Sequence, residues 1–473
     1  MENFNKLVSQ IDQIVWGIPL LVLIIFCGIL LSCRTGFIQV HKLGKALKYM
    51  LKDEENGSGE VSSFAALCTA LSATVGTGNI VGVATAVAAG GAGALFWMEI
   101  AAFLGMATKY AEGLLAIKYR TIDKNGSILG GPFYYIENGL GKKWKWLAKL
   151  FALFGLLAGL LGIGTITQIN GITSAANNFF DPNAIHKISI FGQTVTLTTV
   201  IAGLLITICV ALIIIGGIKR IATVSEIIVP IMIILYIGSC LLIIFGHITE
   251  IPNAIVTVIQ SAFGIRPIAG GFAGITIVML SMRNGISRGI FSNEAGLGSA
   301  PIAAAAAKTK EPVRQGLVTM TGTFIDTILV CTMTGLAIVM AGSYEKDLQG
   351  VQITTDAFCY GLPFPEQVSS FILMICLAVF AFTTILGWNY YSERCLSYLI
   401  GGSNPKITMI YRWIYVFAVL IGPYLTVEAV WNIADIFNGL MALPNVFALI
   451  CLSGTVASET KDYLQRLKKG EVK

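Results

Sequence analysis

The chain has 473 residues, of which 55% are hydrophobic and only 12% are charged, and its mean hydropathy is +0.77. A soluble domain ordinarily carries about 25% charged residues. This composition excludes a soluble globular protein and indicates one that crosses the membrane several times. The ten cysteines occur singly and the three histidines are scattered, so neither a disulfide framework nor a metal cluster is expected.

Apolar runs predict eleven membrane-spanning helices, each long enough to cross the hydrocarbon core. They cover approximately residues 14–33, 61–89, 93–117, 147–180, 195–217, 222–245, 272–291, 317–342, 367–400, 407–425 and 428–458. The first run is interpreted as a span and not as a signal peptide, because Glu2 and Asp12 offset Lys6 and leave no basic leader.

The basic residues support this count of spans. If the loop after the first span is cytoplasmic, 27 lysines and arginines fall at cytoplasmic ends, Arg283 and Arg288 among them, and 4 fall outside. Lys109 lies within a span. Cytoplasmic loops carry an excess of Lys and Arg, so we expect a cell-membrane protein with its N-terminus outside and its C-terminus in the cytoplasm.

Eleven spans divide into one additional helix and two sets of five. Inverted repeats with broken helices near the midplane are typical of secondary transporters. The expected divisions are an N-terminal helix and basic loop over 1–60, one five-helix repeat over 61–250, a second over 251–458 and a basic cytoplasmic tail over 459–473. The predicted fold class is therefore an all-α polytopic membrane protein.

The second span contains a stretch that is too polar and too rich in glycine for a helix facing lipid. Residues 72–80 read Ser-Ala-Thr-Val-Gly-Thr-Gly-Asn-Ile, and Gly76 and Gly78 lower helix propensity. Backbone that leaves the helix at mid-membrane has carbonyls for a cation and N–H groups for an anion. The stretch predicts a binding site; the alternative is a helix whose small residues allow close packing.

The seventh span opens the second repeat and is expected to break as well. Glycines are dense at residues 270–274 and again at 284–289, and the sequence does not distinguish which cluster is the break. The following segment, residues 287–301, is interpreted as a packed cytoplasmic element that contributes to a gate.

Uncharged polar side chains in two other spans are candidate ligands. The hydroxyls of Thr383 and Thr384, with backbone carbonyls, suit a hard monovalent cation; the alternative is hydrogen bonding to carbonyls of their own helix. Gln168 follows an uncharged run and can donate and accept; its alternative role is a hydrogen bond between helices.

Ionisable residues inside spans are functional candidates by default. Lys109 and Glu112 are three residues apart and are expected to pair on one helix face. Asp326 has no obvious partner in the sequence and is a candidate proton carrier. Glu226 is near a span end and reaches the membrane interface.

The substrate chemistry follows from these groups. The break in the second span has N–H groups for a carboxylate, while Asn79 and Gln168 have neutral dipoles and no carboxylate lies within the break. A zwitterion fits this arrangement better than a cation. Phe272 and Trp388 would limit the size of the pocket, which favours a small neutral amino acid; the alternative for both aromatic residues is helix packing.

Several long motifs carry a resemblance to a known family. They are residues 72–80 (above), 90–98 (Gly-Gly-Ala-Gly-Ala-Leu-Phe-Trp-Met), 291–296 (Phe-Ser-Asn-Glu-Ala-Gly), 298–301 (Gly-Ser-Ala-Pro) and 387–391 (Gly-Trp-Asn-Tyr-Tyr). Over roughly residues 10 to 460 the chain resembles the alanine or glycine:cation symporter family of the amino acid–polyamine–cation superfamily. The resemblance implies a leucine-transporter-type fold with one extra N-terminal helix, and sodium-driven uptake of alanine or glycine.

The resemblance also implies roles for individual residues. The implied substrate site consists of Thr77 and Gly78 (N–H groups for the carboxylate), Asn79, Gln168 (the amine contact) and the pocket walls Phe272, Thr276 and Trp388. The implied sodium site consists of the carbonyls of Ser72 and Val75 and the hydroxyls of Thr383 and Thr384. The expected partners are the amino acid substrate, the sodium ion and the bilayer, without a nucleic acid or protein partner.

One residue departs from the family pattern: Glu99 stands where tryptophan is expected, which leaves the identity of the coupling cation open. The nearest rival is a proton-coupled symporter that uses Asp326 or Glu99. A channel is a second alternative, and it would never concentrate its substrate. A membrane enzyme is disfavoured, because the spans hold no HExxH motif.

Overall fold

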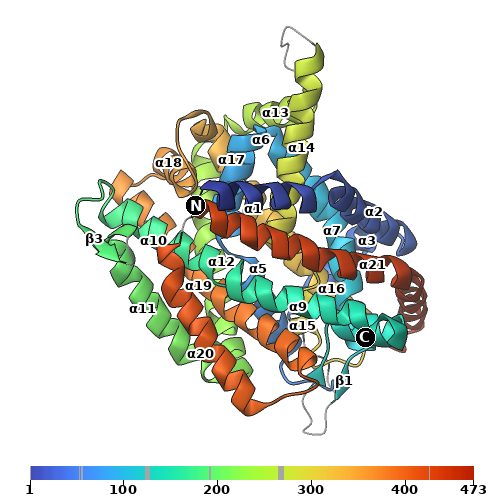
Figure 1. The fold of residues 1–473 in the computed structure, drawn as a ribbon. Coiled ribbons are helices and arrows are strands. Elements are labelled where there is room, and N and C mark those ends of the chain that lie inside the picture. The colour runs from blue at the N-terminus through green and yellow to red at the C-terminus, as the bar shows by residue number, and fades with distance from the viewer. Residues whose placement is uncertain are drawn as a thin grey trace.

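The computed structural model describes residues 2–52, 54, 57–122, 128–190, 193–264, 271–425 and 427–472 of the chain. These residues form a bundle of helices with two short hairpins (Figure 1). The first part holds α1 (Glu2–Val15), α2 (Ile18–Arg34), α3 (Ile38–His41), α4 (Leu43–Met50), α5 (Ser63–Thr74), η1 (Gly78–Gly82), α6 (Val83–Gly90), α7 (Gly93–Lys118), β1 (Thr121–Ile122), β2 (Ile128–Leu129), α8 (Pro132–Gly139), η2 (Lys142–Trp144), α9 (Lys145–Leu161) and α10 (Ile166–Phe180).

The remainder of the chain continues the same pattern of long helices. It holds β3 (Lys187–Ile190), β4 (Gln193–Thr196), α11 (Leu197–Ile214), α12 (Gly217–Gly246), α13 (Ile251–Ala262), α14 (Gly271–Asn293), α15 (Ala300–Ala304), α16 (Pro312–Thr323), η3 (Phe324–Cys331), α17 (Thr332–Ala341), η4 (Ser343–Glu345), α18 (Val351–Gly361), α19 (Glu366–Leu399), α20 (Pro405–Ile421), η5 (Gly422–Tyr424) and α21 (Val427–Lys468). Both hairpins are antiparallel, with Thr121 opposite Leu129 and Lys187 opposite Thr196.

The spans agree with the sequence expectation in all but one case. Among the described residues, nine helices are long and apolar enough to cross a membrane, and the bent pair α5 and η1–α6 makes a tenth. The eleventh expected span is α14, which is a helix of 23 residues. It carries Arg283 and Arg288, and its sequence is more polar than those of the helices counted as apolar enough to cross a membrane. The chain is a multi-pass membrane protein.

Helix α14 corrects two expectations. It runs without interruption through residues 284–289, so this cluster is not a break, and the helix ends at Asn293 before the separate short helix α15. Residues 265–270 lie outside the described part of the chain. Arg283 and Arg288 are therefore within α14 and not at its cytoplasmic end. Arg288 lines a pocket together with Gln349 and Ile353, which precede or begin α18.

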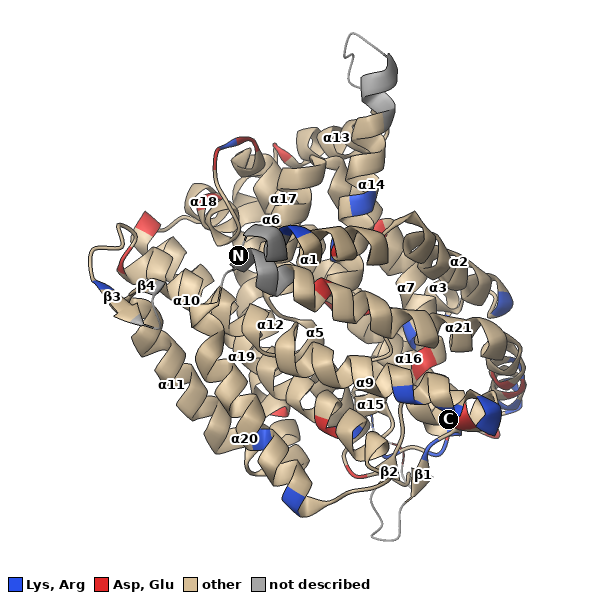
Figure 2. Cartoon of the chain, viewed as in Figure 1, with Lys and Arg blue, Asp and Glu red and all other residues tan. Residues whose placement is uncertain are grey.

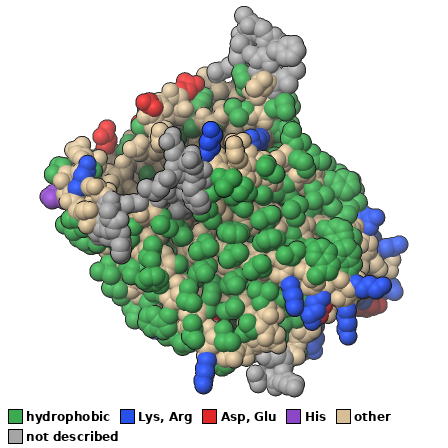
Figure 3. Space-filling model, in the orientation of Figure 1, with side chains coloured by type: hydrophobic (Ala, Val, Ile, Leu, Met, Phe, Trp, Pro, Cys, Tyr) green, Lys and Arg blue, Asp and Glu red, His purple; other side chains and the backbone are tan. Residues whose placement is uncertain are grey.

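Apolar side chains cover the flank of the molecule, whereas many polar side chains lie inside it. Four side chains of α11 are half exposed or more: Leu204, Leu205, Ile208 and Leu212. Figure 3 shows hydrophobic side chains spread over the flank of the molecule. Such a surface is stable against hydrocarbon, which also forces backbone polar groups to pair within helices. In contrast, the wall of α7 from Gly105 to Ile117 is buried throughout.

Charged residues gather at the ends of the bundle. Figure 2 shows lysines and arginines concentrated around β1, the C-terminus and the near ends of α20 and α9. We refer to this as the β1 end, and to the opposite end, which carries α13, α18 and the β3–β4 hairpin, as the α18 end. The distribution supports the expected orientation, and the side of the membrane on which each terminus lies remains a prediction.

The expected division into two repeats also remains a prediction. One feature of the fold agrees with it: the span that opens each expected repeat is discontinuous. In the first repeat, α5 is separated from η1 and α6, and in the second, α14 is separated from α15. Both interruptions lie inside the bundle, where the candidate site is located.

Candidate functional site

The first break lies where the sequence predicts it. Helix α5 ends at Thr74, and Val75 takes an extended conformation with φ −77° and ψ 97°. The π-helix η1 then leads into α6, and the two halves of the span are bent by 52°. Val75 is fully buried and Gly78 is buried as well. The polar backbone freed here is therefore enclosed by protein and not exposed to lipid.

Side-chain amides satisfy two N–H groups of this break. The N–H of Gly76 donates to Oδ1 of Asn79 at 2.9 Å, and the N–H of Thr77 donates to Oε1 of Gln168 at 3.2 Å. Gln168 in turn donates from Nε2 to the carbonyl of Ile163 at 2.9 Å. Of the two N–H groups expected to bind a carboxylate, that of Thr77 thus points to an oxygen with partial negative charge. Gly78, the other expected donor, is packed against Ser292, which a Cβ on it would approach within 3.2 Å.

Thr384 of α19 contacts the break directly. Its Oγ1 donates to the carbonyl of Val75 at 3.2 Å and to the carbonyl of Phe380 at 3.0 Å. A Cβ added at Gly76 would lie 2.5 Å from this Oγ1 and 3.1 Å from Oε1 of Gln168. Only glycine fits at this close approach between α19, α10 and the break.

Two other expected sodium ligands make different side-chain contacts. The hydroxyl of Thr383 donates to the carbonyl of Phe380 at 2.9 Å and lies 3.5 Å from Sδ of Met232. Ser72 was expected to contribute its carbonyl oxygen, and its hydroxyl donates to the carbonyl of Thr69 at 2.8 Å. Both are hydrogen bonds to the residue's own helix. The structure brings Thr384 and Val75 together, and their role in holding sodium remains a prediction.

The second break follows α14 and depends on residues with positive φ. Glu294 has φ +56°, Gly296 +89° and Gly298 +78°, and α15 begins at Ala300. The freed N–H groups of Gly296 and Gly298 both donate to Oε1 of Glu112 on α7, each at 3.2 Å. This segment was expected to be a packed cytoplasmic element; it is buried and separates α14 from α15, and the side of the membrane on which it lies remains a prediction.

Glu294 connects the second break to two other helices. Its Oε1 accepts a hydrogen bond from the indole N–H of Trp388 at 2.8 Å. Its Oε2 accepts from the hydroxyls of Ser299, at 2.5 Å, and Thr74, at 3.5 Å. Glu294 and Trp388 are both buried. Trp388, expected to be a pocket wall, is thus hydrogen-bonded to a buried carboxylate of the second break.

Asp326 joins the two breaks. Its Oδ1 accepts a hydrogen bond from Nδ2 of Asn79 at 2.7 Å. Its Oδ2 accepts from the hydroxyl of Ser292 at 2.9 Å and from that of Thr327 at 2.7 Å. The residue lies in the π-helix η3, and the whole cluster is buried. The sequence suggested no partner for Asp326, whereas the fold surrounds it with oxygen-bearing side chains of the kind that hold hard cations.

Two expected pocket walls lie away from this cluster. Phe272 is at the start of α14, and its side chain is outside the described part of the structure. Thr276 is exposed and precedes Ser292 by sixteen residues on the same helix, which corresponds to about 24 Å along the axis at 1.5 Å per residue. The structure does not bring Thr276 to the two breaks.

The expected pair on α7 is arranged differently. Glu112 accepts from the N–H groups of the second break and, at 2.7 Å, from Nδ2 of Asn445. Within the described residues no ion pair joins it to Lys109. Lys109 is buried and lines a cavity of about 10 Å³ with Thr74 and Asn293. Glutamate and lysine are thus placed beside both breaks.

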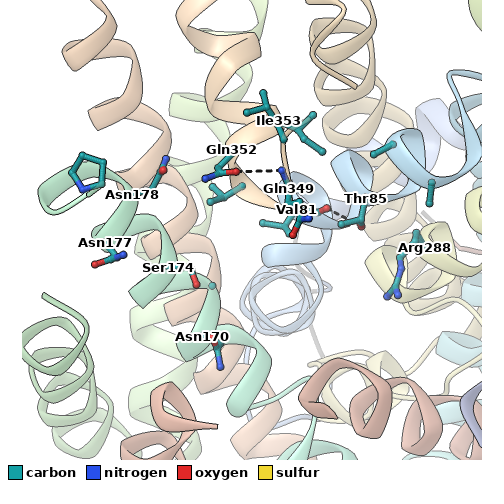
Figure 4. Close-up of a pocket in the computed structure, with 17 residues that line it drawn as sticks. Val81, Thr85, Asn170, Ser174, Asn177, Asn178, Arg288, Gln349, Gln352 and Ile353 are labelled. Atoms are coloured by element: carbon teal, nitrogen blue, oxygen red, sulfur yellow. Dashed lines mark hydrogen bonds between the residues drawn. The ribbon is translucent and has the colours of Figure 1, made fainter. Parts of the chain in front are cut away.

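A large pocket reaches from the α18 end toward the first break. It has a volume of about 840 Å³ and is lined by side chains of η1, α6, α10, α14 and the segment before α18 (Figure 4). Amide groups are frequent in its wall, including Asn170, Asn177 and Gln349. Its floor includes Gly171, where an added Cβ would lie 2.5 Å from Cγ2 of Thr77. Val81 of η1 also lines the pocket, so the pocket lies next to the first break.

Sequence reasoning missed Ser292 and Glu294 as members of the site. Both stand in a motif that carries the family resemblance, but the motif was assigned to the cytoplasmic side. The signal that identifies the break is the pair Gly296 and Gly298 directly after a charged residue in an apolar span. Both glycines have the positive φ that such a turn requires.

Comparison with known proteins agrees with this architecture. A sequence model of the sodium:alanine symporter family matches residues 1–473. The chain is 45% identical over 481 residues to the sodium/alanine symporter AgcS of Methanococcus maripaludis, covering 100% of this chain and 99% of AgcS. The chain belongs to the sodium:alanine symporter family. Members of this family are transporters, so the protein is a transporter and not an enzyme.

Other members of the family carry different names. The chain is 35% identical to a Bacillus subtilis protein named "Probable sodium/glutamine symporter GlnT", over 99% of this chain and 92% of that protein. It is 34% identical to the amino-acid carrier protein AlsT of the same organism, over 99% and 94%. Family membership therefore indicates transport of an amino acid with sodium. The names of the members differ in which amino acid is transported.

A solved structure confirms the fold. The crystal structure of MhsT in complex with L-phenylalanine superposes with a TM-score of 0.54 at 14% identity, covering 85% of this chain and 98% of MhsT. MhsT has the leucine-transporter-type fold, which the sequence resemblance implied for this chain. At this identity the likeness concerns the fold alone.

Proposed function

We propose that the protein is a sodium-coupled symporter that imports alanine or glycine by alternating access. The observation that carries the proposal is the first break. Its N–H groups at Gly76 and Thr77 are directed at acceptors, and Val81 of η1, directly after the break, lines the pocket from the α18 end. Membership in the sodium:alanine symporter family supports the choice of ion and substrate.

The substrate site is proposed at the first break. The carboxylate of the amino acid would replace the amide oxygens that now accept from Gly76 and Thr77, and Gln168 would turn toward the amine. Gly78 and Asn79 continue the same surface. Trp388, Phe272 and Thr276 were assigned as walls from the resemblance; of these, Trp388 lies among the residues of the two breaks through Glu294.

Sodium has two candidate positions. The first is the set implied by the resemblance, in which Thr384 and the carbonyl of Val75 are in contact, with Ser72 and Thr383 nearby in sequence. The second is the oxygen cluster of Asp326 and Ser292, which links both breaks. An ion at either position would order the breaks, and by linkage the ion and the substrate would each raise the affinity for the other by the same factor.

The test is alanine uptake into proteoliposomes with an inward sodium gradient, with potassium in place of sodium as the control. Accumulation above the equilibrium level with sodium only is the expected result. Equilibration without accumulation would indicate a channel and would contradict the proposal. Competition by unlabelled glycine and by glutamine in the same assay would rank the candidate substrates.

A proton is the second candidate for the coupling ion. Glu99 is half-buried, and its Oε1 has no hydrogen-bond partner among the described residues. The proton is favoured if alanine is taken up in potassium under a pH gradient with the acid side outside, and if this uptake is lost in Glu99→Gln. Sodium-dependent uptake that is unchanged in Glu99→Gln would exclude this role for Glu99.

A further inference from the structure

The β1 end of the candidate path is closed by two segments that lie side by side. One is residues 57–61, which lead into α5, and the other is residues 305–309, which follow α15; we call them the entry segment and the exit segment. The N–H of Glu60 donates to the carbonyl of Ala306 at 2.9 Å, and the N–H of Lys308 donates to that of Val61 at 2.8 Å. Val61 and Ala307 form a parallel bridge. The outer ends of both broken helices are thus joined (Figure 1).

The entry segment fits the exit segment only because it carries two glycines. A Cβ at Gly57 would lie 2.3 Å from the carbonyl oxygen of Lys308, and a Cβ at Gly59 would lie 2.4 Å from the carbonyl carbon of Ala307. These contacts are to backbone atoms, which cannot turn away as a flexible side chain does. The two segments are packed as closely as adjacent backbones allow.

One side chain, Arg120, binds both segments. From Nη1 it donates to the carbonyls of Ala305 and Ala307, each at 2.9 Å. From Nη2 it donates to the carbonyl of Thr309 at 2.6 Å and to the carbonyl of Ser58 at 2.8 Å. A further contact of 3.1 Å reaches the hydroxyl of Ser58. Arg120 follows the end of α7, so it belongs to neither segment that it joins.

The chemistry of these contacts requires arginine. The carbonyls of Ala305 and Ala307 follow the last turn of α15, so they have no partner within that helix. The guanidinium presents five donors in a rigid planar fork, whereas the ammonium of lysine has three donors around a single point. Arg120 therefore satisfies several carbonyls at once and fixes the distance between the entry and exit segments.

We propose that Arg120 is the latch that holds the β1 end closed, so that its release is part of the step that opens the path to that side. The inference rests on the proposed alternating-access function and assigns a residue to one half of the cycle. The entry segment and the exit segment are the outer ends of the two broken spans. Opening toward the β1 end moves them apart, and the hydrogen bonds of Arg120 to at least one of the two segments then have to be broken or exchanged for water.

Glu60 makes a second set of contacts that holds the entry segment in place. We expect these contacts to keep the closure partly intact when Arg120 is removed. Oε2 of Glu60 forms an ion pair with Arg394 of α19 at 3.2 Å, and Oε1 accepts from the N–H of Ile128 at 2.6 Å. Removal of Arg120 alone is therefore expected to loosen the closure without unfolding it. This makes the contribution of Arg120 measurable in folded protein.

The experiment compares Arg120→Gln with Lys118→Gln by hydrogen–deuterium exchange in nanodiscs. Lys118 is a matched control, because it lies two residues away and pairs with Glu459 at 2.6 Å on the surface. We expect exchange in peptides covering the entry and exit segments to be at least tenfold faster in Arg120→Gln, with the remaining helices unchanged. Lys118→Gln is expected to match the wild type, and Arg120→Lys to restore little of the protection.

A second variant keeps the test decisive if Arg120→Gln does not fold. Gly59→Ala separates the same segments while Arg120 is retained, and it is expected to give the same local increase in exchange. Unchanged exchange in either folded variant would overturn the latch. A uniform increase over the whole chain would overturn it as well, because it would mean that Arg120 only stabilises the fold.

Transport kinetics separate the latch from the substrate site. In Arg120→Gln we expect the maximal rate of sodium-driven alanine uptake to change at least fivefold, with the half-saturating alanine concentration within twofold of the wild type. A change in half-saturation alone would contradict the latch. If wild-type protein shows no sodium-driven uptake, the proposed function fails, whereas the exchange result still decides whether Arg120 holds this end closed.

Discussion

Close packing around single atoms decides which residues the first break tolerates. Gly76 lies against Thr384 and Gln168, and the space that a side chain would need is already occupied by their oxygens. Thr384 in turn bonds the carbonyl of Val75. Side chains of α19 and α10 therefore contact the backbone of the break directly. We expect small changes at the break to have large effects on transport.

Gly76→Ala is predicted to reduce alanine uptake at least tenfold. A methyl group would lie 2.5 Å from Oγ1 of Thr384, so α19 or the break has to move. Gly82→Ala is the matched control, because a Cβ at this position has nothing within 4 Å. Initial rates in proteoliposomes, normalised to purified protein, measure the effect. Equal activity of both variants would contradict the close approach at Gly76.

Thr384→Ala is predicted to raise the half-saturating sodium concentration about tenfold, equivalent to about 1.4 kcal/mol. Thr383→Ala is predicted to have a smaller effect, since its hydroxyl bonds its own helix and lies near Met232. Sodium titration of alanine uptake distinguishes the two variants. The assignment of Thr384 fails if both titrations match the wild type.

At the scale of elements, buried carboxylates hold the interrupted span together. Glu112 of α7 accepts from Gly296 and Gly298, and Glu294 accepts from Trp388 of α19. Non-helical backbone inside a membrane is tolerated only where its polar groups are paired within protein. The second break is therefore stable because three helices converge on it.

Glu112→Ala is predicted to lower the melting temperature of the detergent-solubilised protein. It leaves buried N–H groups of Gly296 and Gly298 without their acceptor, at a cost of about 1–3 kcal/mol for each unpaired group. Glu112→Gln keeps an acceptor oxygen and should lose less. Glu226→Gln, at an exposed position, should leave the melting temperature unchanged. A larger loss for Gln than for Ala would contradict the role of Glu112 as an acceptor.

At the scale of the whole molecule, the two ends of the bundle are unlike. The α18 end carries a pocket of about 840 Å³ that reaches the first break, while the β1 end is closed beneath both breaks by the entry and exit segments. A path that is open to one end and closed at the other is the arrangement that a symporter needs before it binds its substrate. From the concentration of basic residues at the β1 end we predict that this end faces the cytoplasm.

Cysteine labelling is predicted to confirm this orientation. Gln349→Cys, in the wall of the pocket, should react in intact cells with a membrane-impermeant maleimide, above the background of the native cysteines. Lys143→Cys, in η2 at the β1 end, should react only in inverted vesicles. Sodium and alanine together should slow the reaction at Gln349→Cys at least threefold if the pocket closes. The reverse pattern of sidedness would overturn the assigned orientation.

Local properties of the sequence determined the spans and the first break. Hydrophobic length and glycine content act within a window of some twenty residues, so they identified ten of the eleven spans and placed the first break in residues 72–80. The family resemblance then supplied the fold, which the comparison with MhsT confirms. Polar side chains in otherwise apolar spans had already indicated Gln168 and Thr384, which the structure brings to the break.

Only the tertiary structure decided the second break and the partners of its polar groups. Asn79 and Asp326 are 247 residues apart in the chain, Trp388 and Glu294 are 94 apart, and Arg120 is 185 or more from the carbonyls of the exit segment. Which of these groups meet depends on how helices from both halves of the chain pack, and no local pattern encodes that. A buried polar group is stable only beside its partner, so the fold, and not the composition of any one span, made Glu294 and Arg120 functional candidates and showed the partners of Asp326.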